Sequence, residues 1–181
     1  DVDLEILTCE FGVNTGKFSV WDKVGAAYNE IVLDSKPGAI QTKIVDWNQD
    51  GKQDILTLFA QGDERLMLYI NKGNLTFTAI ELLKFPPVYG STSFDVIFNK
   101  TKKWYDVVYT CGDNADYSII PKPYHGVYKY ENEGNNRLKQ SYFYPLNGAT
   151  KVAACDFDND GDIDLAAIAY YANFEEKIPR G

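Results

Sequence analysis

The sequence predicts an all-β fold built from repeated groups of antiparallel strands. A short acidic pattern, D-x-[DN]-x-D-G-x-x-D, occurs twice in the 181 residues, at 46–54 and at 156–164. Each copy is followed by a short apolar run without helical caps, which is typical of a buried strand. No 3.6-residue periodicity of useful length occurs in the chain, so we expect strands and turns rather than helices.

The strand-like runs recur at nearly constant spacing. The aspartates that open them are separated by 51, 52 and 58 residues, at Asp3, Asp54, Asp106 and Asp164. A second strand type, which carries an aromatic residue and ends in glycine, recurs at 18–25, 66–73 and 127–134. A period of about 50 residues made of strand signals is typical of a β-propeller, in which each repeat forms one four-stranded blade.

The acidic patterns have the composition of calcium sites. Five aspartates within nine residues at 156–164 repel one another unless a cation lies among them. Oxygen ligands at alternate positions around a glycine turn suit Ca²⁺, which takes six to eight oxygens. We therefore predict two calcium sites. The ligands of the first are the side chains of Asp46, Asn48, Asp50 and Asp54 with the Lys52 carbonyl, and those of the second are the side chains of Asp156, Asp158, Asp160 and Asp164 with the Asp162 carbonyl.

Two alternatives to this interpretation are an EF-hand and an acidic turn that binds no metal. An EF-hand needs a bidentate glutamate at the twelfth loop position and a helix on either side. The twelfth positions here are Thr57 and Ala167, and both loops lie between strand-like runs. The EF-hand is therefore excluded, and the metal-free acidic turn remains open.

Composition excludes several broad classes of protein. The hydrophobic content of 45% and the aromatic content of 14% argue against disorder. The net charge is −8 and no basic stripe is present, so nucleic-acid binding is not expected. No apolar run approaches the roughly 20 residues that span a membrane.

The acidic loops, together with a later Tyr-x-Asn-x-Gly sequence, resemble FG-GAP/VCBS-type repeats, as in integrin α-chain propellers. That sequence occurs at 69–73 and at 130–134. The resemblance implies Ca²⁺ in the loop between the first and second strands of a blade. It also implies a secreted, periplasmic or cell-surface location, and binding or scaffolding in place of catalysis.

The resemblance assigns the whole chain, 1–181, to one incomplete propeller segment. We expect a partial blade at 3–33, full blades at 39–83 and 92–144, and a partial blade at 150–181, the second and fourth of these having calcium loops. In the third blade the ligand positions hold Phe98, Lys100 and Lys102, which cannot bind Ca²⁺. Exposed sheet edges would then be covered by the remaining propeller blades or by another chain.

A partner surface is expected on the face opposite the calcium loops, where the longest irregular segments lie. These segments are rich in tyrosine and proline, which suits recognition of a protein or a glycan. An alternative is that the aromatic residues pack the loops onto the blades. The residues predicted to line the partner surface are Tyr89, Tyr117, Tyr124, His125 and Tyr171.

No catalytic constellation is evident, and we expect that the protein is not an enzyme. The single histidine, His125, lies among proline and tyrosine, and no zinc-ligand spacing or G-x-S-x-G sequence occurs. The sequence favours a calcium-stabilised protein-interaction, cell-adhesion or scaffold module. The alternatives are a lectin-like carbohydrate-binding propeller and an accessory domain of a larger secreted enzyme.

Overall fold

The computed structural model describes residues 4–113 and 121–171, and these residues form β-strands and no helix. The predicted all-β fold class is therefore confirmed. The strands are β1 (Ile6–Glu10), β2 (Lys17–Val24), β3 (Ala27–Asp34), β4 (Ala39–Val45), β5 (Asp54–Phe59), β6 (Arg65–Gly73), β7 (Thr76–Lys84), β8 (Ser91–Asn99), β9 (Trp104–Cys111), β10 (Gly126–Asn132), β11 (Leu138–Pro145), β12 (Ala149–Cys155) and β13 (Asp164–Ala169).

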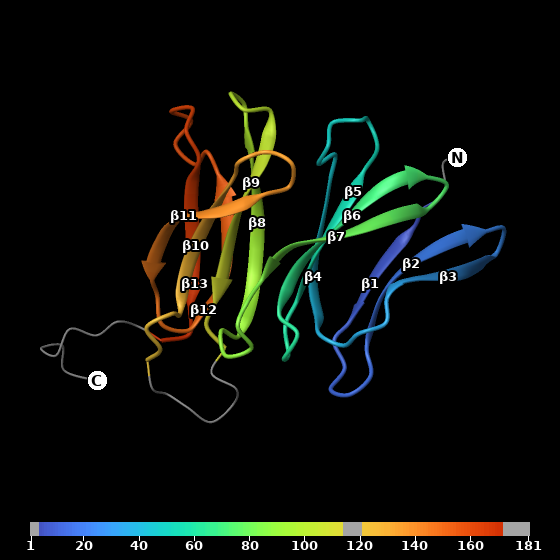
Figure 1. The fold of residues 1–181 in the computed structure, drawn as a ribbon, viewed down its shortest axis with the longest axis horizontal. Helices are drawn as coiled ribbons and strands as arrows, with labels where there is room; N and C mark the ends of the chain where they lie inside the picture. Colours follow the sequence, from blue (N-terminus) through green and yellow to red (C-terminus); the bar gives the residue numbers. More distant parts are fainter. Residues whose placement is uncertain (1–3, 114–120, 172–181) are drawn as a thin grey trace, which may run out of the picture. The chain divides into compact units, whose positions relative to one another are not determined.

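The strands form four antiparallel sheets in which sequence neighbours pair (Figure 1). Their orders are β1-β2-β3, β4-β5-β6-β7, β8-β9-β10-β11 and β12-β13, and none of them closes on itself. The two complete four-stranded blades and the two partial blades of the predicted fold class are thus present. The chain divides into two compact units, Asp1–Val88 and Tyr89–Gly181, each holding one complete and one partial blade.

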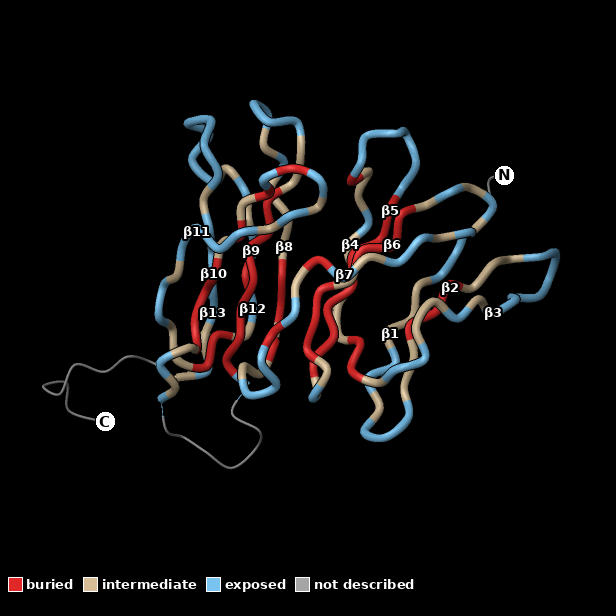
Figure 2. Tube along the Cα trace, in the orientation of Figure 1, coloured by how far each residue is buried: buried red, intermediate tan, exposed pale blue. Residues whose placement is uncertain are grey.

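In the first unit, the β1–β3 sheet packs on the β4–β7 sheet through a shared apolar core. Phe18 and Val20 of β2 meet Ile55, Phe59 and Tyr69 of the neighbouring sheet. Every residue of β5 is buried, because this strand is paired on both sides and covered on its faces (Figure 2). In the second unit, Val108, Val127 and Val152 form the corresponding core between the β8–β11 sheet and β12.

The first strand of each acidic or degenerate repeat carries the same irregularity. The register between the first and second strands shifts at Ala39/Gln41, at Ser91/Ser93 and at Ala149/Lys151. One extra residue on the first strand at this place is a β-bulge, which bends the strand and increases its twist. The bulge shows that the three segments are structural repeats, although their sequences at this place differ.

An ion cluster around the buried Arg65 joins the two sheets of the first unit. Arg65, at the start of β6, is 3% exposed and donates to the Asp34 carboxylate at the end of β3, at 2.8 Å. Asp63 accepts hydrogen bonds from Lys36, Lys84 and Arg65, and these cations, Lys36 and Lys84 most of all, hold its pKa well below the usual range. The Arg65 guanidinium also lies 4.2 Å from the ring centre of Phe59.

The described residues contain no helix that could cross a membrane. None of the residues 4–113 and 121–171 lies in a helix with the length and hydropathy of a membrane crossing.

Candidate metal centre

The two acidic loops have the same backbone conformation. The fourth residue of each loop is in the left-handed region, with φ of 59° at Gln49 and 61° at Asn159. The sixth residue, Gly51 or Gly161, also has positive φ, at 85° and 100°. A glycine at this position adopts such a φ without steric cost, which explains its place in both sequences.

The side chains of both loops also fold inward onto the same backbone N–H groups. In each loop the side chains at positions three and five each accept a hydrogen bond from the backbone N–H two residues later. The side chain at position one accepts the N–H of the glycine at position six, and the side chain at position nine accepts the N–H of the residue at position two. The bonds in the first loop are Asp50 N to Asn48 Oδ1 (3.0 Å), Lys52 N to Asp50 Oδ1 (2.9 Å), Gly51 N to Asp46 Oδ2 (3.0 Å) and Trp47 N to Asp54 Oδ2 (3.0 Å). Those in the second are Asp160 N to Asp158 Oδ1 (3.2 Å), Asp162 N to Asp160 Oδ1 (3.0 Å), Gly161 N to Asp156 Oδ2 (3.1 Å) and Phe157 N to Asp164 Oδ2 (2.9 Å).

The second loop gathers three carboxylates in a geometry that fits a cation. One oxygen each from Asp156, Asp158 and Asp164 lies within 4.8 Å of the others. Asp156 Oδ1 is buried and accepts no hydrogen bond from the described residues. Burying a carboxylate oxygen without a partner is costly, and a hard cation at this place would satisfy it. The donor set and the unpartnered oxygen therefore fit Ca²⁺.

The first loop satisfies more of its charge internally. Both oxygens of Asp46 accept backbone N–H groups, from Asp50 and from Gly51. The Asp50 carboxylate lies 3.3 Å from the Lys52 ammonium, and the backbone N–H of Lys52 is the main cause that lowers the pKa of Asp50. Because fewer of its carboxylate oxygens lack a partner, we expect this loop to bind a cation less tightly than the second.

The charged state of two loop carboxylates is disfavoured in the absence of a cation. Burial raises the pKa of Asp54, against the opposing effect of three backbone N–H groups. In the second loop the pKa of Asp162 is raised, first by its hydrogen bond with Asp160, then by burial, and also by the charges of Asp164 and Asp156. A divalent cation would favour the charged carboxylates in both loops.

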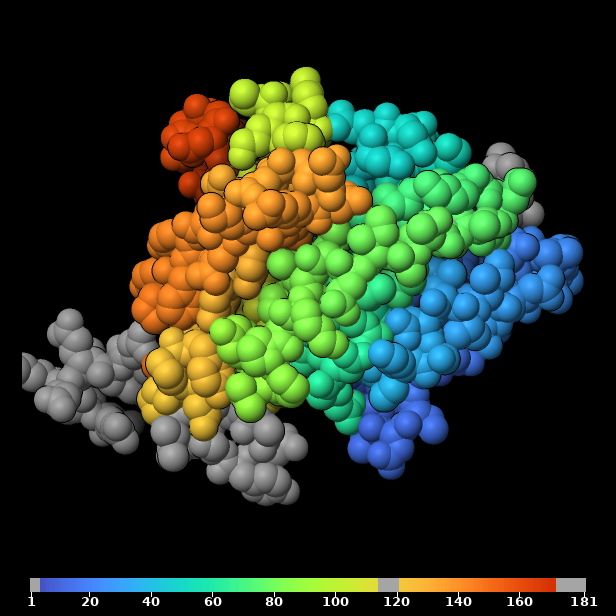
Figure 3. Space-filling view, viewed as in Figure 1, coloured from blue at the N-terminus to red at the C-terminus, as the bar shows by residue number. Residues whose placement is uncertain are grey.

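The corresponding turn of the third repeat has a different construction. Its three ligand positions hold Phe98, Lys100 and Lys102, as noted from the sequence. Asn99 closes the turn by accepting the N–H groups of Thr101 and Lys102, at 3.1 and 2.9 Å. This turn and the second acidic loop project from the same end of their unit, in yellow-green and red in Figure 3.

One hydrogen bond next to the first acidic loop also occurs in the third repeat, whose turn holds Phe98, Lys100 and Lys102 at the predicted ligand positions. Asp54 Oδ1 accepts the backbone N–H of Asn71 at 2.8 Å, and Asp106 Oδ1 accepts that of Asn132 at 2.9 Å. Both aspartates are buried, at 0% and 2% exposure. Each asparagine in turn accepts the N–H of the glycine two residues later. The Tyr-x-Asn-x-Gly sequence thus fixes the third strand of a blade to the aspartate that begins the second strand.

Comparison with known families matches residues 46–97 to the FG-GAP-like repeat. The chain carries an FG-GAP-like repeat. The matched residues run from the first acidic loop through β5, β6 and β7 into β8, so they contain the loop, the aspartate and the asparagine just described. Neither the curated proteins nor the solved structures contain a significant match. The second acidic loop lies outside the matched residues and shares the backbone conformation and hydrogen bonds of the loop in the FG-GAP-like repeat.

Asp106 has a structural role that does not depend on metal. We expect Asp106→Ala to destabilise the protein by about 2 kcal/mol, because the buried N–H of Asn132 loses a charged acceptor. Urea unfolding with calcium and with chelator should give the same loss, since the adjacent turn has no ligand set. A loss that appears only in calcium would contradict this role.

The structure brings together three of the predicted partner residues. The rings of Tyr89 and Tyr124 stack at 5.1 Å, and His125 contacts Tyr124 edge-on at 5.2 Å. Tyr128 continues the stack and donates its hydroxyl to the Tyr124 carbonyl at 2.6 Å. Tyr89 and Tyr124 are half-buried, so each keeps an accessible part.

The other predicted partner residues are placed differently. Tyr171 is half-buried beside Tyr170 and close to Gly148, where a Cβ would meet its ring. His125 is 1% exposed, and neither ring nitrogen has a hydrogen-bond partner among the described residues. Tyr117 lies outside the described residues. The burial of His125 agrees with the alternative in which the aromatic residues pack the loops onto the blades.

The burial of His125 predicts a pH dependence of stability. Burial lowers the pKa of His125, the Lys122 charge lowers it further, and Asp113 opposes this effect. The unfolded chain therefore binds more protons than the folded chain just below pH 6.5, so stability should fall as the pH drops through this range. Because the chain has one histidine, His125→Phe should flatten urea-unfolding stability between about pH 5 and 7. An unchanged slope in this variant would contradict the assignment.

Proposed function

We propose that both acidic loops bind Ca²⁺ and that the metal has a structural role. The observation that carries this proposal is the buried, unpartnered Oδ1 of Asp156 inside a group of three carboxylates. The equivalent backbone conformation of the first loop supports a second site. Bound Ca²⁺ would neutralise the clustered carboxylates and hold the turn between two strands.

The chain's own residues provide the frame for such a site. Side chains at the third and fifth positions of each loop already accept local backbone N–H groups, which orients their remaining lone pairs. The aspartate at the ninth position connects the loop to the sheet behind it, through Trp47 N–H in one loop and Phe157 N–H in the other. Occupancy of the loops should therefore stabilise the blades as well as the turns.

Isothermal titration calorimetry with calcium tests this proposal. We expect two binding events, with the tighter one abolished by Asp158→Ala. Asp162→Asn is the matched control. The predicted ligand atom of Asp162 is its backbone carbonyl oxygen, which the substitution keeps, so this variant should weaken calcium binding far less than Asp158→Ala. The absence of calcium binding to the wild-type chain would overturn the proposal.

We further propose that the protein is a non-catalytic interaction or adhesion module that acts in a secreted, periplasmic or cell-surface setting. Calcium is plentiful there, so sites of modest affinity would be filled. The proposed partner surface is centred on the stacked Tyr89 and Tyr124, which are half-buried, and tyrosine is a residue type that suits contact with a protein.

Selection from a displayed peptide library, with a glycan array in parallel, tests the partner surface. We expect selected peptides to lose binding to Tyr124→Ala, which keeps the carbonyl that Tyr128 uses. Tyr142→Ala is a matched control, since Tyr142 is an exposed tyrosine on β11. Binding to glycans alone would favour the lectin-like alternative. Peptide binding that survives Tyr124→Ala would place the surface elsewhere.

A further inference from the structure

A short sequence at the tip of the β6–β7 hairpin has the pattern of an N-linked glycosylation site. Residues 74–76 are Asn-Leu-Thr, which fits N-x-[ST] with a residue other than proline in the middle. The pattern occurs a second time, at 99–101, as Asn-Lys-Thr. Because a pattern of three residues also arises by chance, the surroundings of each asparagine decide which of them is suited to carry a glycan.

The turn between β6 and β7 presents Asn74 to solvent. Gly73 pairs with Thr76, so Asn74 and Leu75 form a two-residue loop. Their φ values of 51° and 53° are those of a type I′ turn. A positive φ is unusual for leucine, and Leu75 is held in place by packing against the apolar core of the first unit. With Leu75 directed inward, Asn74 and Thr76 are both exposed.

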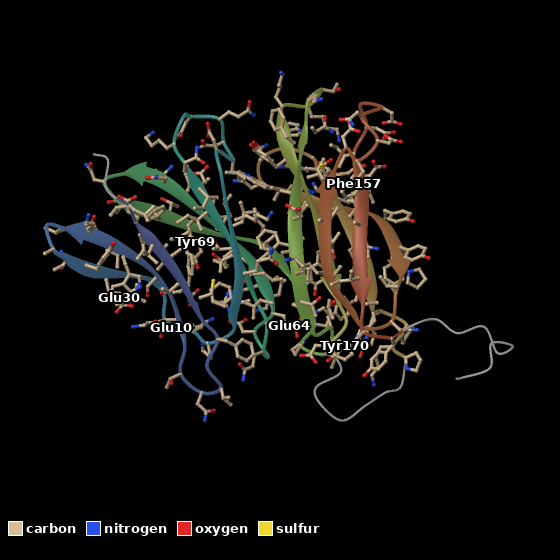
Figure 4. All side chains as sticks on the ribbon, turned by 180° about the vertical axis from the view of Figure 1, so that it is seen from behind. Glu10, Glu30, Glu64, Tyr69, Phe157 and Tyr170 are labelled. Atoms are coloured by element: carbon tan, nitrogen blue, oxygen red, sulfur yellow. The ribbon has the colours of Figure 1, made fainter. Side chains whose placement is uncertain are left out.

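The Asn74 side chain is also free of contacts that a substituent would displace. It makes no hydrogen bond within the described residues, and the Thr76 hydroxyl donates to the backbone carbonyl of Asn74, at 3.4 Å. The turn itself is fixed by the strand that precedes it, which continues from Tyr69, labelled in Figure 4. Asn71 of this strand donates Nδ2 to the Gln53 carbonyl at 3.0 Å, which ties the hairpin to the first acidic loop.

Asn99 has different surroundings. It is half-buried, and its Oδ1 accepts the N–H groups of Thr101 and Lys102 to close the turn between β8 and β9. A bulky group on this amide would have to fit beside a side chain that is already held by hydrogen bonds. Since N-linked glycans are bulky and lie on the protein surface, the structure favours Asn74 over Asn99.

We propose that Asn74 is the acceptor of an N-linked glycan. The inference rests on the proposed secreted or cell-surface setting, because the sugar donor, a lipid-diphosphate-linked oligosaccharide, belongs to the secretory route. Asn74 Nδ2 forms a bond to the anomeric carbon of the donor, and the bond from this carbon to the diphosphate oxygen breaks. The lipid diphosphate leaves with the bonding electrons, and the amide loses one proton to a base of the transferring enzyme.

Secretion of the full chain from mammalian cells, directed by an added signal peptide, tests this inference. Because the signal peptide supplies the setting, a negative result for the glycan is separate from any error in the proposed location. Peptide-N-glycosidase converts a glycosylated asparagine to aspartate, so mass spectrometry after this treatment in heavy-oxygen water locates the modified residue. We expect Asn74 to be modified in most of the wild-type chains.

Three variants separate the acceptor from its surroundings. Thr76→Val keeps the branched shape of the side chain at the start of β7 but removes the hydroxyl, and it should abolish the glycan. Thr76→Ser keeps the hydroxyl and should retain the glycan. Asn99→Gln is the matched control, and it should leave the modification of Asn74 unchanged.

The exposure of the hairpin tip adds a test on the folded protein. Peptide-N-glycosidase should release the glycan from the calcium-loaded chain without denaturant, and calcium binding should be the same before and after release. An unmodified Asn74 in chains from both the medium and the cell lysate would overturn the inference, and if these chains still bind calcium the proposed metal sites are unaffected. A glycan found on Asn99 alone, or one released only after unfolding, would also overturn it.

Discussion

Chelation of calcium is expected to lower the free energy of unfolding by roughly 2.7 kcal/mol for each unit, compared with calcium at about 100 times the dissociation constant. The two acidic loops lie in different units, so both units should respond. For a unit of about 90 residues this change corresponds to a drop in melting temperature on the order of 10 °C. Differential scanning calorimetry with calcium and with chelator measures the shift.

Single-site variants show which loop produces the effect. Asp158→Ala should remove the calcium response of the second unit and leave that of the first. Magnesium at the same concentration is a control for ionic strength, and it should stabilise less because it demands a smaller, near-octahedral cage. A wild-type melting curve that is identical with and without calcium would rule out the structural role of the metal.

Arg65→Met is expected to destabilise the first unit by about 3–5 kcal/mol. The substitution keeps much of the apolar stem but removes the charge that lies between Asp34 and Asp63. Arg65 is almost fully buried, and it also covers the ring of Phe59. The substitution leaves Asp34 without its cation and Asp63 with only the exposed Lys36 and Lys84, and breaking an ion pair at a buried cation is why the cost is large. Urea unfolding monitored by tryptophan fluorescence gives the loss.

Lys36→Met is the matched control for this prediction. Lys36 contacts the same carboxylate, Asp63, but its side chain is 63% exposed. An exposed ion pair contributes only about 0–1 kcal/mol, because water screens it and the side chain loses conformational freedom. Equal losses in the Arg65 and Lys36 variants would show that burial does not decide the strength of this cluster.

Much of the fold could be predicted from the sequence because its signals are local and repeated. The glycines at Gly51 and Gly161, the aspartates around them and the apolar runs after them define a turn between strands without reference to the rest of the chain. The bulge at Ala39/Gln41 and its two counterparts could not be predicted in this way. A bulge depends on how one strand fits its neighbour. The small first residue and the β-branched second residue that the three places share do not by themselves specify a bulge.

The candidate site shows the same division between local and tertiary signals. The predicted acidic ligands follow from residue type and spacing, whereas the role of Asp54 and Asp106 in accepting a distant asparagine N–H depends on strand pairing. The recurrence of Tyr-x-Asn-x-Gly at 69–73 and 130–134 was the available signal for this contact. The burial of His125 corresponds to the alternative in which the aromatic residues pack the loops onto the blades, and the sequence alone does not decide between this packing and a partner surface.

A crystal structure of the calcium-loaded protein, with anomalous scattering measured from the metal, tests the central claim most directly. The account predicts a calcium peak in each acidic loop, with oxygen ligands at about 2.3–2.6 Å that include Asp156 Oδ1. It predicts no such peak at the turn closed by Asn99, where the ligand positions hold lysine and phenylalanine. Clear density for both acidic loops with no metal between their carboxylates would contradict the account.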